Sequence, residues 1–131
     1  MKINHNKIKV LATQFNLSLV LLFGSQAKGN THTESDVDIA FFSFSVVDEE
    51  KLREELMHLF HRADIDIVNI YKCQNHLLRY QILSTGKVLY ESNKGLKSKL
   101  EWQSYFDYVD FKKYYDSQSE VLDQKIAVMV G

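Results

Sequence analysis

Proline is absent from this chain of 131 residues, and cysteine occurs once, as Cys73. A single cysteine excludes an intramolecular disulfide and a cysteine metal cluster, which favours a reducing compartment. No apolar run approaches the length of a membrane span, and the first residues are polar, unlike a signal peptide. We therefore expect a cytoplasmic protein without a membrane partner. The lack of proline is compatible with long helices but indicates no function.

The sequence also lacks an excess of charge of either sign. It has 16 basic and 17 acidic residues, and no cluster of lysine and arginine stands out. A protein that follows a nucleic-acid duplex usually carries a basic stripe, because phosphate neutralisation supplies most of the non-specific affinity. We therefore expect no direct nucleic-acid partner. The length and the 45% of hydrophobic residues predict a single globular domain over residues 1–131.

The apolar pattern predicts an α/β or α+β fold, a mixed β-sheet flanked by α-helices. Gly86 is expected to end one of the helices in the C′ position. A last helix carries aromatic residues on two faces, more than one core needs, and its surplus face is a candidate protein interface. The predicted elements are helix 3–15, strands 19–23 and 37–42, helix 48–62, strand 64–70, helix 76–85, strand 87–90 and helix 96–115.

A Gly-Ser turn lies at the end of the first predicted strand, and an Asp-Val-Asp segment lies inside the next strand. Gly24 and Ser25 follow the first strand, and Asp36 and Asp38 come after ten further residues. Residues two apart in a strand share a face, so the two carboxylates should point together while Val37 faces the core. Converging carboxylates repel each other in a cleft, and a hard divalent cation between them relieves the repulsion. The segment therefore predicts a metal site.

The third strand supplies further carboxylates, Asp64 and Asp66, on its solvent-facing side. Either could join the metal site. Asp66 is the better candidate, because Asp64 lies at the entrance of the strand, where a polar residue is an ordinary finding. A glycine turn allows the backbone to approach a phosphate closely, and one or two Mg²⁺ ions could then bridge the phosphates and the carboxylates. This arrangement suggests nucleotidyl transfer.

The segments 22–29 and 35–40 resemble the motif of the DNA polymerase β-like nucleotidyltransferase superfamily, and the length resembles its minimal nucleotidyltransferase (MNT) branch. The resemblance covers about residues 19–91. It implies a polymerase β-like fold with a core of about 17–91 and a helical region of about 96–130. It also implies catalytic, metal-binding Asp36, Asp38 and Asp66, two Mg²⁺ ions, and ATP as substrate. The nucleotide-binding residues that it implies are Gly24, Ser25, Lys28 and Ser35.

One position departs from the family pattern. Many relatives have arginine where this chain has Lys28, and lysine lacks the bidentate fork that clamps a phosphate. Two further basic residues, Arg79 and Lys87, are candidates for phosphate or partner contacts.

The resemblance further implies a partner, because MNT proteins commonly accompany a HEPN ribonuclease toxin and act as antitoxins. The implied reaction transfers AMP from ATP to a toxin tyrosine, with Asp66 as acceptor of the hydroxyl proton. An antitoxin that only binds its toxin is one alternative. A small-molecule enzyme of the aminoglycoside-modifying type is another, although such substrates normally need an extra domain or a dimer to enclose them.

Overall fold

The computed structural model describes residues 3–24 and 36–130, with side chains described to residue 118. The predicted order of elements is confirmed. The last helix is the main difference, since it continues far beyond residue 115. The elements are α1 (His5–Gln14), β1 (Leu19–Phe23), β2 (Val37–Phe42), α2 (Glu49–Phe60), β3 (Ile65–Asn69), α3 (His76–Thr85), β4 (Lys87–Glu91) and α4 (Leu96–Val130).

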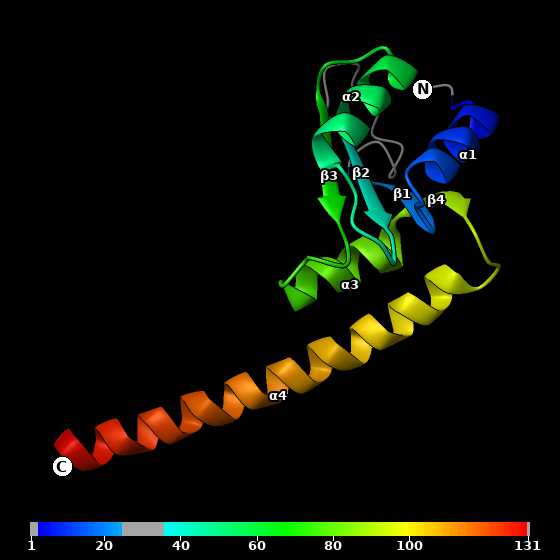
Figure 1. Cartoon of the computed structure of the whole chain (residues 1–131). Coiled ribbons are helices and arrows are strands. Elements are labelled where there is room, and N and C mark those ends of the chain that lie inside the picture. Colours follow the sequence, from blue (N-terminus) through cyan, green and yellow to red (C-terminus); the bar gives the residue numbers. More distant parts are fainter. Residues whose placement is uncertain (1–2, 25–35, 131) are drawn as a thin grey trace.

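The four strands form one mixed sheet in the order β3-β2-β1-β4 (Figure 1). Strand β1 is antiparallel to both of its neighbours, whereas β2 and β3 run parallel to each other with α2 as the crossover. Parallel neighbours begin at the same edge of a sheet. The residues that open β2 and β3 are therefore brought side by side.

Helices cover both faces of the sheet, and the strands divide their apolar side chains between two cores. On β2, Val37 and Ile39 face the core under α1 and α2, while Ala40 and Phe42 face the core under α3 and α4. Strand side chains alternate between faces, so Asp38 lies on the side of α3 and α4. The buried residues of these two clusters anchor the strands that carry the acidic residues.

The start of α2 agrees with the prediction from its residues. The side chain of Asp48 accepts a hydrogen bond from the backbone N–H of Lys51 at 3.2 Å, and Glu49 and Glu50 follow in the first turn. A capping carboxylate satisfies an unpaired N–H group, and acidic residues complement the positive end of the helix dipole. These local interactions fix where the crossover helix begins.

Gly86 ends α3 as predicted, but its conformation is not that of a left-handed helix cap. Its φ of −66° and ψ of 142° are extended, and its N–H donates to the carbonyl of Ile82 at 2.8 Å. A Cβ at this position would lie 2.6 Å from the Ile82 oxygen and 3.1 Å from a methyl carbon of Leu21. Glycine is therefore required here by the closeness of the Ile82 carbonyl of α3, and then of the Leu21 side chain on β1, rather than by a positive φ.

Helix α4 is the longest element, with 35 residues. Its first turns pack beside α3, where Leu100 and the partly buried Leu96 join the second core. Farther along, the helix extends away from the sheet, and its end lies far from the other elements (Figure 1). Among the helices in the described part of the chain, none has the length and apolar character needed to cross a membrane.

Candidate functional site

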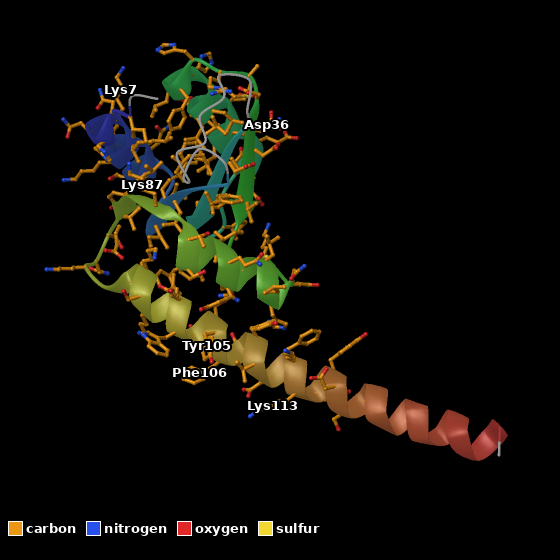
Figure 2. All side chains as sticks on the ribbon, turned by 180° about the vertical axis from the view of Figure 1, so that it is seen from behind. Lys7, Asp36, Lys87, Tyr105, Phe106 and Lys113 are labelled. Carbon is orange, nitrogen blue, oxygen red and sulfur yellow. The ribbon has the colours of Figure 1, made fainter. Side chains whose placement is uncertain are left out.

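Strands β2 and β3 place two of the predicted acidic residues directly opposite each other. Asp38 is the register partner of Asp66 across the parallel pair, and it is also the partner of Phe23 on β1. Asp38 is half-buried, whereas Asp66 and Asp36 are exposed. Asp36 immediately precedes β2 instead of lying inside it, and Figure 2 shows it near the edge where the strand begins.

The three carboxylates act on one another electrostatically. Burial raises the pKa of Asp38 above its usual range, and the negative charges of Asp66 and then Asp36 raise it further. Each of these effects penalises the ionised form of Asp38. The ionised form of Asp38 is therefore disfavoured in the folded protein, and a cation bound beside it would favour that form.

Gly24 lies directly beside the side chain of Asp38. Its φ of +76° is a conformation that other residues rarely adopt, and a Cβ added there would lie 2.4 Å from Oδ2 of Asp38. The turn after β1 therefore approaches the carboxylate more closely than any side chain would permit. The predicted phosphate-binding residues Ser25, Lys28 and Ser35 lie outside the described residues.

Asp64, the alternative to Asp66, is already engaged. Nε of Arg62 donates to Oδ1 of Asp64 at 2.8 Å, and Nη2 donates to Oδ2 at 2.5 Å. This fork lowers the pKa of Asp64, chiefly through its hydrogen bonds. Arg62 was not among the residues predicted to belong to the site. The available signal was its position two residues before a carboxylate, which is common on protein surfaces and has little specificity.

The donor set fits a hard cation in its chemistry, because carboxylate oxygens are the ligands that such cations prefer. The carboxylates nevertheless do not form a preorganised metal-binding site. Within residues 3–24 and 36–130, no group of three or more histidine, cysteine, aspartate or glutamate side chains is placed to hold a metal ion. The assignment of Asp36, Asp38 and Asp66 as metal ligands therefore stays a prediction.

The two other basic candidates have different environments. Arg79 on α3 is partly buried, and its Nε has no hydrogen-bond partner among the described residues. Lys87 at the start of β4 is exposed, and β4 packs against α1. Neither residue contacts the acidic group in a described interaction, so their predicted phosphate contacts remain predictions.

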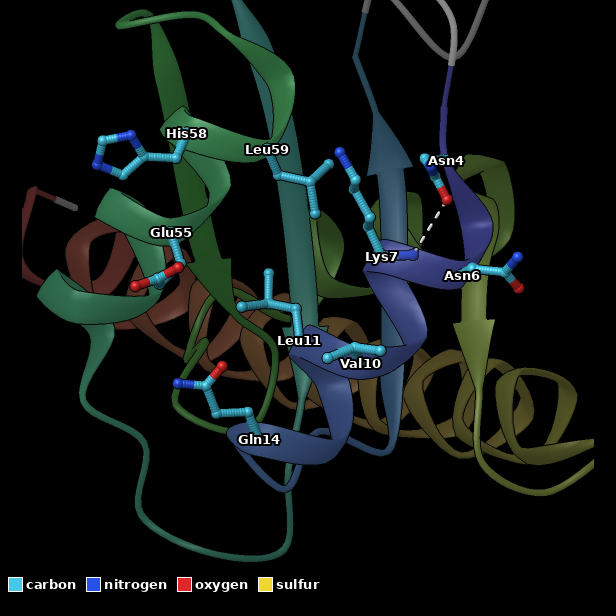
Figure 3. A pocket seen from close by; sticks show the side chains of 9 residues that line it. All are labelled: Asn4, Asn6, Lys7, Val10, Leu11, Gln14, Glu55, His58 and Leu59. Carbon is cyan, nitrogen blue, oxygen red and sulfur yellow. Dashed lines mark hydrogen bonds between the residues drawn. The ribbon is translucent and has the colours of Figure 1, made fainter.

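A broad hollow of about 470 Å³ lies between α1 and α2 (Figure 3). It is bordered by polar side chains, among them Lys7, Glu55 and His58, and none of the candidate carboxylates lines it. Because α1 and α2 cover the opposite face of the sheet from Asp38, this hollow is separate from the acidic group. Its volume alone therefore does not make it the reactive site.

Exposed aromatic side chains on α4 form a second notable surface. Trp102 and Phe106 are 63% and 57% exposed, with stacked rings whose centroids are 6.0 Å apart. Tyr105 and Trp102 also border a hollow of about 360 Å³ against Tyr80 of α3. Figure 2 shows Tyr105 and Phe106 on α4, well separated from Asp36. The predicted surplus aromatic face of this helix is thus present and solvent-exposed.

Comparisons with known proteins show which family this chain resembles. Residues 6–95 match the model of the family described as polymerase beta, nucleotidyltransferase. The chain is also similar to the protein adenylyltransferase MntA of Shewanella oneidensis (strain MR-1), with 34% identity over 94 residues. The match covers 68% of this chain and 66% of that relative, so it leaves about a third of the relative's length unmatched.

Solved structures show the same fold. A toxin–antitoxin crystal structure with AMP-PNP contains a chain that matches with a TM-score of 0.75 and 24% identity, covering 92% of this chain and 98% of that one. A re-refined structure of tri-AMPylated Shewanella oneidensis HEPN toxin with MNT antitoxin matches with a TM-score of 0.67 and 21% identity. That match covers 90% of this chain and 94% of the other. At these identities the likeness establishes the fold.

Proposed function

The chain belongs to the polymerase β nucleotidyltransferase family, and on this basis we propose that it is an antitoxin with Mg²⁺-dependent adenylyltransferase activity. Its proposed reaction transfers AMP from ATP to a tyrosine of a HEPN-domain toxin and neutralises that toxin. The observation that carries the proposal is the pair Asp38 and Asp66, opposite each other on parallel strands beside Gly24. The similarity to an adenylyltransferase supports AMP as the transferred group.

Asp36, Asp38 and Asp66 are the residues that would hold Mg²⁺. When bound, the ions supply charge neutralisation for the triphosphate and stabilise the entering and leaving oxygens of the displacement. Burial, and then the negative charges of Asp66 and Asp36, raise the pKa of Asp38, and this supports the role because a bound cation would favour the ionised carboxylate. Gly24 lets the turn after β1 lie against the carboxylate of Asp38, at a distance that a Cβ would not permit.

The proposed chemical step is an in-line displacement at the α-phosphorus of ATP. The tyrosine oxygen forms a bond to phosphorus, the bond to the β-phosphate oxygen breaks, and pyrophosphate leaves with that electron pair. A phenol with a pKa of about 10 keeps its proton at neutral pH, so a base is needed. Asp66 would accept the proton, since it is exposed on the edge strand where an acceptor protein could reach it.

A mass measurement tests the activity. The purified chain is incubated with a HEPN-domain toxin, ATP and Mg²⁺, and the intact masses are recorded. We expect the partner to gain the mass of one or more AMP groups. The variant Asp36→Asn with Asp38→Asn should slow the transfer by at least about a hundredfold. Glu54→Gln, which removes an exposed carboxylate on α2, is the matched control and should leave transfer unchanged.

The exposed aromatic face of α4 favours a second candidate, in which the chain neutralises its partner by binding alone. The same double variant separates the two functions. If it still protects cells from the toxin without any mass gain, occlusion is sufficient and transfer is dispensable. If protection and mass gain disappear together while the complex still forms, transfer is the neutralising event.

A further inference from the structure

Four carboxylates, not three, line the edge where β2 and β3 begin. Asp36 and Asp38 flank Val37, and Asp64 and Asp66 flank its register partner on β3. The N–H of Val37 donates to the carbonyl of Asp64 at 3.0 Å, which continues the pairing beyond the start of β3. Asp36 therefore neighbours Asp64 as Asp38 neighbours Asp66. Position on the sheet alone does not determine which three would bind a cation.

Arg62 distinguishes one carboxylate from the other three. Its guanidinium holds both oxygens of Asp64, at 2.8 and 2.5 Å, and its side chain is only 20% exposed. The charge of Asp36 also raises the pKa of Arg62, after the larger effect of Asp64. The guanidinium thus lies within electrostatic reach of the acidic group. A bidentate arginine pair fixes the orientation of its carboxylate as well as its charge.

The backbone on either side holds Arg62 in place. His61 ends α2 with a φ of 53°, in the left-handed region, and the N–H of Arg62 donates to the carbonyl of Met57 at 3.1 Å. Arg53 of α2 also contacts β3: its Nε donates to the carbonyl of Ile65, which lies between the two acidic residues, at 2.9 Å. The fork therefore joins a capped helix end to a strand whose position is itself fixed.

We infer that Arg62 is a positioning residue that withholds Asp64 from the metal-binding group, so that Asp36, Asp38 and Asp66 form that group alone. This inference rests on the proposed function for its kinetic consequence. Without the fork, Asp64 would add a fourth free carboxylate beside Asp36 and compete with Asp66 for the same cation. The cation would then bind more tightly but in an arrangement less suited to transfer.

The first experiment measures Mn²⁺ binding to the chain alone, by titration with spectroscopic detection of free ion. We expect Arg62→Ala to tighten Mn²⁺ binding by up to about fivefold, the effect of one partly exposed charge near a cation. Adding Asp64→Asn to that variant should return the affinity to near the wild-type value. This readout needs neither the partner nor transfer, so it tests Arg62 even if the proposed function fails. Unchanged Mn²⁺ affinity in Arg62→Ala would overturn the inference.

The second experiment measures AMP transfer by the same variants against Mg²⁺ concentration. Arg62→Ala should transfer severalfold more slowly at saturating Mg²⁺, although it binds the ion more tightly, and damage to the fold does not produce this combination. Asp64→Asn should restore the rate of Arg62→Ala. Failure to restore it would assign Arg62 a direct contact with substrate and overturn the positioning role.

Arg62→Lys separates the fork from the charge. Lysine keeps the positive charge but has no planar pair of donors. We expect Arg62→Lys to transfer AMP at a rate between that of the wild type and that of Arg62→Ala. A rate equal to that of the wild type would show that charge alone suffices and would reject the fork as the cause.

Discussion

Gly24 and Asp38 form the tightest contact in the candidate site. The turn at Gly24 has a positive φ, and the space where its Cβ would stand is filled by the carboxylate of Asp38. Two separate requirements therefore select glycine, one from the backbone conformation and one from the neighbouring side chain. Only the second concerns the proposed chemistry.

A pair of substitutions separates those requirements. Gly24→Ala should lose stability through the strained φ and should also weaken Mn²⁺ binding, because the added methyl group must displace Asp38. Gly95→Ala is the matched control, since Gly95 has a φ of +94° but no atom within 4 Å of the added Cβ. Each variant should lose about 1 kcal/mol of unfolding free energy from backbone strain, measured by urea denaturation. Equal Mn²⁺ affinity in both variants would contradict the proposed role of the Gly24 contact.

The raised pKa of Asp38 predicts a stability that falls with rising pH. Burial, then Asp66, then Asp36, raise the pKa above 3.8, so the folded chain keeps this proton to a higher pH than the unfolded chain does. Stability is consequently lost as pH rises from 3.8 through the raised value. Asp38→Asn should stabilise the metal-free protein at neutral pH by up to about 1 kcal/mol. The gain should shrink toward zero below pH 3.8.

Urea denaturation with a chelator present, at neutral and acidic pH, measures this effect. Asp110→Asn, an exposed aspartate on α4, is the control and should show no such gain. Destabilisation of Asp38→Asn at neutral pH would mean that its carboxylate is favourably bonded in the folded protein.

The residue pattern could identify the acidic segment but not the partners of each carboxylate. The candidates Asp36, Asp38 and Asp66 could be predicted from the sequence, because alternation in a strand places side chains on known faces. The pairing of Asp64 with Arg62 could not be predicted, because it depends on the direction in which α2 ends. Ion pairs between nearby charges are too common in sequences to be assigned without coordinates.

At the scale of elements, short sequence patterns predicted the positions of helices and strands, which depend on interactions between residues close in the chain. Asp48 marked the start of α2, and the apolar runs marked all four strands. The strand order β3-β2-β1-β4 was not predictable from these signals, because pairing joins segments far apart in the chain. Gly86 shows the same limit: its position at the helix end was evident, whereas its packing against Leu21 on β1 was not.

At the scale of the whole molecule, the acidic group and the aromatic face of α4 lie in separate places. Such a division allows a partner to be held at one surface and modified at another. The aromatic face is apolar and exposed, and Trp102 and Phe106 contribute its most exposed stacked pair. Central aromatic residues often supply much of the binding energy of an interface.

Replacing Trp102 and Phe106 with serine should therefore weaken binding of the proposed HEPN-domain partner by at least about tenfold. Calorimetric titration of the partner into the chain measures the affinity, and thermal unfolding checks the fold. Val46→Ser is the control, since Val46 is 96% exposed and lies between β2 and α2 instead of on α4. Equal affinity of the double variant and the wild type would exclude this face as the docking surface.

The chain has one tryptophan, and it lies at Trp102. At 63% exposure its indole ring is in contact with water, so its emission should be red-shifted in the isolated protein. Any molecule that covers the ring should shift that emission to shorter wavelength. The protein therefore carries an intrinsic fluorophore at the surface in question, and association can be followed in real time without a dye or a tag.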